Sequence, residues 1–194
     1  MTKTLYLMRH GQTLFNVRRK IQGWCDAPLT QLGIYQAQKA GEWFKEREIS
    51  FDCAYSSTSE RACDTLEIIT DMDYSRKKGL KEWNFGTFEG ESEDLNPALP
   101  YGEFFKAYNG ESEEEVRQRV SACLKEIMEK DGHESVLAVS HGASCAQFYL
   151  EWEKYNQVNR DGRLQNCCIL KYEYKDGIFR LVELWNEPIK EIGQ

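Results

Sequence analysis

The chain has no long hydrophobic run, and this absence excludes a membrane-spanning protein. Nowhere among its 194 residues do about 18 apolar side chains follow one another, as a transmembrane helix requires. The apolar stretch between Lys3 and Arg9 is also too short for the core of a signal peptide. We therefore expect a soluble, cytoplasmic protein with no membrane partner.

Positive charge is also scarce. The 25 lysines and arginines are outnumbered by 32 aspartates and glutamates, and no basic run is long enough to follow a nucleic-acid backbone. Nucleic acid is therefore not an expected partner. The sequence has no internal repeat, and its length suits one hydrophobic core, so residues 1–194 are predicted to form a single domain. Nothing in the sequence indicates an oligomeric state.

The seven cysteines lack the spacings that cysteine chemistry requires. None belongs to a Cys-x-x-Cys pair, which is typical of zinc sites and thioredoxin-like motifs. None is followed six residues later by the arginine with which a cysteine phosphatase surrounds phosphate. We expect free, buried thiols.

Short apolar runs alternate with amphipathic helices, and this pattern predicts an α/β fold. The expected architecture is a three-layer sandwich, with a mostly parallel central sheet and helices on both faces. Strands are predicted at residues 5–8, 51–55 and 136–139, and a C-terminal hairpin at Asp176-Gly177. Helices are predicted after Thr30, after the capping boxes at 57–60 ("STSE") and 112–115 ("SEEE"), and after His141.

Two histidines follow predicted strands in the same local pattern. His10 ends the run "LYLMRH", His141 ends the run "VLAVSH", and each is followed by a glycine, Gly11 or Gly142. In open α/β sheets, ligands bind at the carboxyl ends of parallel strands, where both histidines are expected to lie. At either glycine a Cβ would crowd the turn or a ligand.

Two arginines are expected at the same edge of the sheet. Arg9 directly precedes His10, and Arg61 falls in the first turn of the helix predicted after residues 57–60. Two guanidinium groups and two imidazoles suit a tetrahedral dianion, because the arginine fork matches phosphate oxygens. Phosphate is therefore the expected ligand. His133 has no such setting and is expected to be an exposed loop residue.

Six blocks, in chain order, resemble the histidine phosphatase superfamily, which includes the phosphoglycerate mutase-like proteins, and together they span nearly the whole chain. They are "LMRHGQTLFN", "LTQLGIYQAQKAGEWF", "YSSTSERACDTLEII", "LKEWNFGTFEG", "GESEEEVRQRV" and "VLAVSHG". The resemblance implies that His10 is the nucleophile and Glu82 the proton donor, with Arg9, Arg61 and His141 as further catalytic residues. The phosphate-binding set that it implies is Arg9, Gly11, Asn16, Gln22, Gly23, Arg61, Glu82, His141 and Gly142.

The chemistry of these side chains fits those roles. A neutral His10 attacks phosphorus in line if its other ring nitrogen donates to an acceptor, for which we expect a nearby backbone carbonyl. Glu82 protonates the leaving alkoxide and then deprotonates the attacking water. Arg9, Arg61 and a protonated or donating His141 stabilise the phosphoryl oxygens, so neither a metal nor a cofactor is expected.

The segment after Glu82 bears on the substrate, and residues 85–111 are predicted to form a small lid. Between Glu82 and Ser112 the only basic residue is Lys106. An acidic, aromatic lid would repel polyanions, which favours a monophosphate ester with a neutral, cationic or apolar alcohol part. Most of the aromatic residues are nevertheless expected to pack the lid onto the core. The acids are Glu89, Glu91, Glu93, Asp94, Glu103 and Glu111, and the aromatics are Trp83, Phe85, Phe88, Tyr101, Phe104, Phe105 and Tyr108.

The favoured function is a metal-independent phosphomonoesterase of the histidine acid phosphatase type, acting on a small-molecule phosphate ester. A cofactor-dependent phosphoglycerate mutase is the alternative. A non-catalytic phosphate-binding or interaction module is less favoured, because the implied nucleophile and its partners are all present. The "DMDYS" stretch at 71–75 resembles the metal-dependent loop of haloacid dehalogenase-type phosphatases, but the residues before it belong to a predicted helix rather than a strand. Asp71 and Asp73 are therefore interpreted as loop residues.

Overall fold

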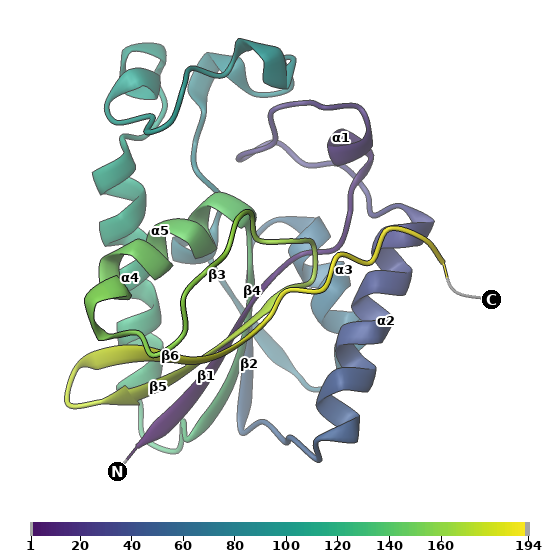
Figure 1. The fold of residues 1–194 in the computed structure, drawn as a ribbon, viewed down its shortest axis with the longest axis vertical. Helices are drawn as coiled ribbons and strands as arrows, with labels where there is room; N and C mark the ends of the chain where they lie inside the picture. Colours follow the sequence, from purple (N-terminus) through teal and green to yellow (C-terminus); the bar gives the residue numbers. More distant parts are fainter. Residues whose placement is uncertain (1, 193–194) are drawn as a thin grey trace.

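A computed structural model describes residues 2–192, which contain a six-stranded sheet in the order β3-β2-β4-β1-β5-β6 (Figure 1). Strands β3, β2, β4 and β1 run parallel, whereas β5 and β6 pair antiparallel. The prediction of a mostly parallel sheet is thus confirmed. The strands are β1 (Lys3–Arg9), β2 (Cys53–Ser57), β3 (Tyr74–Lys77), β4 (Ser135–Ser140), β5 (Ile169–Lys175) and β6 (Ile178–Trp185).

Helices cover both faces of this sheet, with α2 and α3 on one face and α4 and α5 on the other (Figure 1). Side chains alternate along a strand, so Leu5 and Leu7 of β1 join the core beneath α4 and α5, while Tyr6 and Met8 pack beneath α2 and α3. This alternation produces the predicted three layers. No helix within residues 2–192 is long and apolar enough to cross a membrane. The helices are α1 (Leu14–Val17), α2 (Gln31–Glu46), α3 (Glu60–Ile69), α4 (Glu113–Met128) and α5 (Gly142–Trp152).

Local sequence signals fix several element ends as predicted. The Thr30 hydroxyl accepts the Gly33 N–H at the start of α2, and residues 112–115 form a reciprocal capping box at the start of α4. The hairpin between β5 and β6 turns at Asp176 and Gly177, whose φ angles of 52° and 80° are those of a tight hairpin turn.

The predicted capping box at 57–60 is wrong. Ser57 is the last residue of β2, and α3 begins at Glu60 after Ser59, whose side chain makes no capping bond. The Asp26 carboxylate, which comes from a loop distant in sequence, accepts the Glu60 N–H instead. Two short elements, α1 and β3, were not predicted.

Residues 85–111 lie beyond the carboxyl ends of the parallel strands, close to α1 (Figure 1). They contain three short 3-10 turns, η2 (Gly86–Phe88), η3 (Glu93–Leu95) and η4 (Phe104–Tyr108). Phe105 is fully buried, and its ring centroid lies 4.8 Å from that of Phe85 and 5.1 Å from that of Phe104. Phe85 and Phe105 belong to the hydrophobic core and Phe88, Tyr101 and Phe104 pack against it, so most aromatic residues of this segment pack onto the core, as expected.

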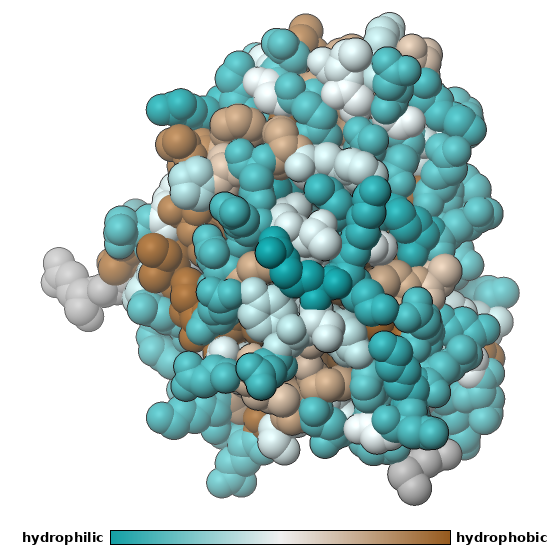
Figure 2. All heavy atoms as spheres, turned by 180° about the vertical axis from the view of Figure 1, so that it is seen from behind, coloured by the Kyte–Doolittle hydropathy of each residue, from teal (hydrophilic) through white to brown (hydrophobic). Residues whose placement is uncertain are grey.

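The aspartates of the "DMDYS" stretch and the seven cysteines lie in settings that match the sequence analysis. Asp71 and Asp73 precede β3, whereas His10 follows β1. Because these strands run in the same direction, the two aspartates lie at the amino-terminal ends of the strands, opposite the end that carries His10. All seven cysteines are free, and five of them are buried. The face turned away in Figure 1 is mostly hydrophilic, with small apolar patches (Figure 2).

Candidate active site

A cavity of about 770 Å³ opens at the carboxyl end of β1. Its walls come from the end of β1, α1 and the loop after it, residues 82–101, the first residue of α4, one side of α5 and residues 160–164. The structure brings six of the predicted site residues into these walls, namely Arg9, His10, Asn16, Gln22, Glu82 and Gly142. The other four, Gly11, Gly23, Arg61 and His141, do not line the cavity.

His10 is held as a neutral base. Its Nδ1 lies 2.7 Å from the Gly11 carbonyl oxygen, which only accepts, so Nδ1 carries the hydrogen and Nε2 keeps its lone pair. Arg61 Nε–H donates to that Nε2 over 3.2 Å. Burial places the pKa of His10 well below its ordinary value, and the positive charges of Arg61 and Arg9 lower it further. The contact with a backbone carbonyl is the one that the sequence analysis expected.

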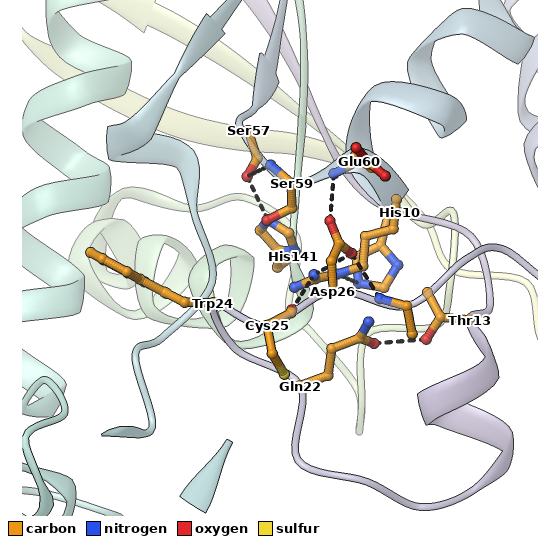
Figure 3. Close-up of polar contacts among 12 residues, drawn as sticks. His10, Thr13, Gln22, Trp24, Cys25, Asp26, Ser57, Ser59, Glu60 and His141 are labelled. Carbon is orange, nitrogen blue, oxygen red and sulfur yellow. Dashed lines mark hydrogen bonds and ion pairs between the residues drawn. The ribbon is translucent and has the colours of Figure 1, made fainter. Parts of the chain in front are cut away.

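Arg61 is fully buried behind His10, and a neighbouring loop orients its guanidinium group. Nη1 donates to the Cys25 carbonyl over 2.9 Å and to the Asp26 carboxylate over 2.8 Å, while Nη2 donates to the Gly23 carbonyl over 2.8 Å. Figure 3 shows the Asp26 carboxylate directed at the backbone N–H of Glu60, the first residue of α3. Asp26 therefore compensates the buried charge and caps the helix that carries it.

Glu89 fixes the opposite side of the same loop. Its carboxylate accepts four backbone N–H groups over 2.8–3.1 Å, from Gly23, Trp24, Cys25 and Phe85. The carbonyls of residues 23 and 25 thus face Arg61 while the amides of residues 23–25 face Glu89. Gly23, which the resemblance places in the phosphate-binding set, donates its N–H to Glu89 and accepts from Arg61 at its carbonyl, so its backbone has no free donor for phosphate. Neither Glu89 nor Asp26 was singled out from the sequence, although Glu89 lies in the motif block "LKEWNFGTFEG".

The Glu82 carboxylate lies at the N-terminus of α5. Oε1 accepts two backbone N–H groups, from Trp83 at 2.9 Å and Ser144 at 2.8 Å, while the Ser144 hydroxyl donates to the Lys81 carbonyl over 2.8 Å. Oε2 accepts one, from Ala143 N at 2.9 Å. Oε2 is thus the oxygen with room for a proton, and Glu82 lines the cavity that also exposes His10.

His141 lies beside His10, with the two ring centroids 5.3 Å apart. Its Nε2 lies 2.7 Å from the Ser57 hydroxyl oxygen (Figure 3). Its Nδ1 is buried and has no hydrogen-bond partner within the described part of the chain. The pKa of His141 lies well below its ordinary value because of burial and the nearby Arg61 and His10, so of the two predicted forms, protonated or donating, the neutral donor fits.

The glycines after the two histidines allow close approach of neighbouring groups. A Cβ on Gly11 would lie 2.5 Å from the Gly33 carbonyl oxygen, so Gly11 makes room for the start of α2 rather than for a ligand. A Cβ on Gly142 would lie 3.1 Å from Arg9 Nε, which shows that this glycine makes room for the guanidinium group.

Further hydrogen-bond donors in the cavity wall lack partners. Arg9 Nη1 donates to the Leu164 carbonyl over 2.7 Å, but Arg9 Nε is buried and unpartnered among residues 2–192. Gln22 Oε1 accepts a hydrogen bond from the Thr13 hydroxyl over 2.7 Å. The buried Nε2 of Gln22 has no acceptor among residues 2–192. Buried donors of this kind suit an anionic ligand rich in oxygen.

Positive charge enters the cavity from segments outside the predicted lid. Arg19, Lys20, Arg160 and Arg163 all line it, whereas Lys106 does not. The lining acids Glu93 and Glu113 are paired with arginines, at 3.9 Å to Arg19 and 3.0 Å to Arg117. Lys20, Arg160 and Arg163 have no carboxylate partner among the residues that the structure describes. The expectation that an acidic lid repels polyanions considered residues 82–112 alone, whereas the cavity as a whole also carries these cations.

The third histidine does not contribute to the cavity. His133 is half-buried rather than exposed, and its Nδ1 lies 2.8 Å from the Ile127 carbonyl oxygen. Within residues 2–192, no group of three or more histidine, cysteine, aspartate or glutamate side chains is placed to hold a metal ion.

The sequence and fold match known proteins over nearly the whole chain. A profile of the histidine phosphatase superfamily (branch 1) matches residues 5–187, and the chain belongs to this superfamily. A probable phosphoglycerate mutase, GpmB of Proteus mirabilis, is 32% identical over 190 residues, covering 89% of this chain and 85% of the relative. An uncharacterized phosphatase, PhoE of Bacillus subtilis, is 30% identical over 184 residues and covers 90% of each chain. The crystal structure of a phosphoglycerate mutase from Bacillus anthracis superposes with a TM-score of 0.81 at 29% identity, covering 93% of this chain and 92% of that one. The relatives thus include both phosphatases and mutases.

Proposed function

We propose that this protein is a metal-independent phosphomonoesterase that hydrolyses a small phosphorylated metabolite through a phosphohistidine on His10. The observation that carries the proposal is the state of the His10 ring. Its Nδ1–H is committed to the Gly11 carbonyl, and its Nε2 lone pair lies beside the Arg61 guanidinium group. A neutral imidazole whose Nδ1–H is anchored in this way presents Nε2 as the nucleophile, and the Arg61 Nε–H that Nε2 accepts in the free protein turns to a phosphoryl oxygen when Nε2 attacks.

The reaction proceeds in two steps. Nε2 of His10 attacks phosphorus, the bond from phosphorus to the ester oxygen breaks, and the departing alkoxide takes a proton from Oε2 of Glu82. Water then attacks the phosphohistidine, Glu82 accepts the proton from that water, and the bond between phosphorus and nitrogen breaks to release phosphate. Arg9, Arg61 and His141 donate to the phosphoryl oxygens in both steps, so that no metal is needed to spread the charge.

The alcohol part of the substrate carries a second anionic group. This extension is supported by three cavity-lining cations that have no carboxylate partner among residues 2–192, namely Lys20, Arg160 and Arg163. It replaces the neutral or cationic alcohol favoured from the sequence of residues 82–112. The double variant Arg160→Gln/Arg163→Gln should raise the KM for 3-phosphoglycerate at least several-fold and leave that for p-nitrophenyl phosphate nearly unchanged. Lys106→Gln is the matched control, because Lys106 lies outside the cavity wall. An equal change of KM on both substrates would reject the second anionic group.

The same three cations favour a phosphoglycerate mutase as the second candidate. The two functions differ in the acceptor of the phosphoryl group from His10, which is water in a phosphatase and a glycerate in a mutase. Release of inorganic phosphate and interconversion of phosphoglycerates, measured on the same preparation with and without a bisphosphorylated primer, separate them.

The proposal is tested first by a screen of phosphorylated metabolites for released phosphate. The enzyme is then mixed with a substrate from this screen, and the reaction is stopped rapidly without acid to trap the phosphorylated enzyme. Acid-labile phosphate should appear on His10 in the wild type. His10→Ala should abolish both the label and turnover, whereas near wild-type activity of this variant would show that the nucleophile is misassigned.

Turnover by the wild type should also persist after dialysis against EDTA. Loss with the chelator and recovery with magnesium would reject the metal-independent mechanism.

A further inference from the structure

Ser57 contacts His141 from the end of β2 and is fully buried. Its hydroxyl oxygen lies 2.7 Å from Nε2 of His141 and also accepts the backbone N–H of Ser59 over 3.3 Å (Figure 3). His141 Nε2 is the only hydrogen-bonding group within the described chain, apart from that N–H, that the Ser57 hydroxyl contacts.

These contacts determine which nitrogen of His141 carries the hydrogen. A neutral imidazole has one N–H, and burial with nearby Arg61 keeps the pKa of His141 well below its ordinary value, so the ring is neutral. If Nε2 carried the hydrogen, Ser57 Oγ would accept two N–H groups, its own hydrogen would have no acceptor, and the lone pair of Nδ1 would be unmatched. If Nδ1 carries it, the Ser57 hydroxyl donates to Nε2, and only the Nδ1–H is left without a partner in residues 2–192.

We propose that Ser57 is a positioning residue that holds His141 in the Nδ1–H tautomer, so that this N–H donates to an oxygen of the transferred phosphoryl group. The inference rests on the proposed function for the identity of the phosphoryl group. The tautomer itself is a property of the free protein and follows from the hydrogen bonds alone.

The consequence concerns the sign of the electrostatic interaction. The Nε2–H tautomer would turn the lone pair of Nδ1 toward whatever Nδ1 contacts, and a lone pair repels phosphoryl oxygens. With Nδ1–H, His141 contributes a neutral donor, and the positive charge at the site comes from Arg9 and Arg61. By removing one hydroxyl group, Ser57→Ala would free the ring to exchange a donor for an acceptor.

Nitrogen NMR of the free protein tests the tautomer directly. The chain has only three histidines, so protein labelled with 15N-histidine gives a readable long-range proton–nitrogen spectrum, and His141→Gln identifies the signals of His141. We expect a protonated Nδ1 and an unprotonated Nε2 for His141 in the wild type at neutral pH. A protonated Nε2 would overturn the proposal. Because this measurement needs no substrate, it stands even if the wild type hydrolyses no phosphate ester, a result that would reject only the proposed function.

Substitution tests whether Ser57 causes the tautomer. Ser57→Ala should move the His141 signals toward the other tautomer and lower kcat/KM by about 10–100-fold, because misplacing a group at the reacting centre can cost about 100-fold in rate. Ser56→Ala is the matched control, because Ser56 is a neighbouring buried serine whose hydroxyl has no partner in the described chain. It should change neither measurement. An unchanged His141 tautomer in a folded Ser57→Ala protein, with folding checked by thermal unfolding, would overturn the role of Ser57.

Discussion

The two oxygens of Glu82 have different surroundings, and this difference determines how the residue can work. Oε1 accepts two backbone N–H groups, whereas Oε2 accepts one and keeps a free lone pair. The carboxyl group can therefore take up and release a proton at Oε2 without losing the hydrogen bonds that hold Oε1 at the start of α5. A proton donor that keeps its position in both protonation states suits a reaction in which the same carboxyl group acts twice.

The first prediction follows from that role. Glu82→Gln should lower kcat/KM on an alkyl phosphate by about 10²–10⁴-fold, because an alkoxide leaves poorly without a proton. The loss on p-nitrophenyl phosphate should be smaller, since an aryl oxide leaves with little protonation. With the aryl ester the variant should also accumulate phosphohistidine, because the water that attacks it lacks a base. Equal losses on both substrates without a trapped intermediate would leave Glu82 as a residue that only shapes the cavity.

The second prediction concerns pH and His10. The pKa of His10 is lower in the folded protein than in the unfolded chain, mainly because of burial. Below the ordinary histidine pKa the unfolded chain therefore binds a proton that the folded protein does not, so stability is present above that pKa and is lost as the pH falls toward the folded-state pKa. Between about pH 7.5 and about pH 5.5 this should cost the wild type about 1 kcal/mol more than His10→Gln in the free energy of unfolding. Urea titrations at both pH values measure the difference, and equal losses in the two proteins would show that His10 titrates normally.

At this scale the sequence predicts residues next to recognisable local signals and misses those that act across the fold. Arg9 and His10 were identifiable because they end a buried strand, and the Gly11 carbonyl lies on the adjacent residue. Asp26 and Ser57 make their contacts with residues 35 and 84 positions away. No local pattern records such contacts, so these two roles emerged only from the structure.

At the scale of elements, the loop of residues 23–25 is the part that links segment 85–111 to the nucleophile. Its carbonyls bind Arg61, which donates to His10, while its amides bind Glu89 from segment 85–111. The loop is held by a cation on one side and an anion on the other. A change at Glu89 is thus transmitted to Arg61 through the peptide groups themselves.

The third prediction tests this link. Glu89→Gln keeps the size of the side chain but replaces one acceptor oxygen with an amide nitrogen, which faces backbone N–H donors. Leaving buried donors unpaired should lower the free energy of unfolding by about 1–3 kcal/mol, as measured by urea denaturation. Because Arg61 loses its orientation, kcat/KM should also fall about 10-fold or more, the scale expected when a group at the reacting centre is misplaced. Glu91→Gln, in the same segment but exposed and without a side-chain partner in the described chain, should change stability by less than about 0.5 kcal/mol. Similar results for both variants would contradict the link.

Elements with strong periodicity or caps were predictable, and short polar elements were not. The four residues of β3, "YSRK", lack the alternation of a half-buried strand, and this edge strand pairs only with β2. The error at α3 has a different cause. The letters of a capping box were present at 57–60, but Ser57 was already paired with β3 as the end of β2, so tertiary structure overrode the local signal.

At the scale of the whole molecule, the cavity is assembled by segments that are far apart in the chain. Its charge illustrates the point: the segment nearest Glu82 is acidic, but Lys20 comes from the loop after α1, and Arg160 and Arg163 come from the loop before β5. The composition of one segment therefore does not predict the electrostatics of a site to which several segments contribute. The fold decides which charges meet there.

The last prediction concerns the binding of phosphate in this cavity. A phosphate ion bound among these segments stabilises only the folded state, so inorganic phosphate should raise the melting temperature relative to chloride at equal ionic strength. At a concentration about 100-fold above the dissociation constant, the expected rise is roughly 5–10 °C for a chain of this size. Arg9→Gln should lose most of this rise, because Arg9 lines the cavity and its Nε lacks a partner within residues 2–192. Arg76→Gln, an exposed arginine on β3, should keep it. The comparison isolates binding from catalysis. An equal rise in both variants would mean that phosphate stabilises the protein somewhere else, and the assignment of the cavity as the phosphate site would then fail.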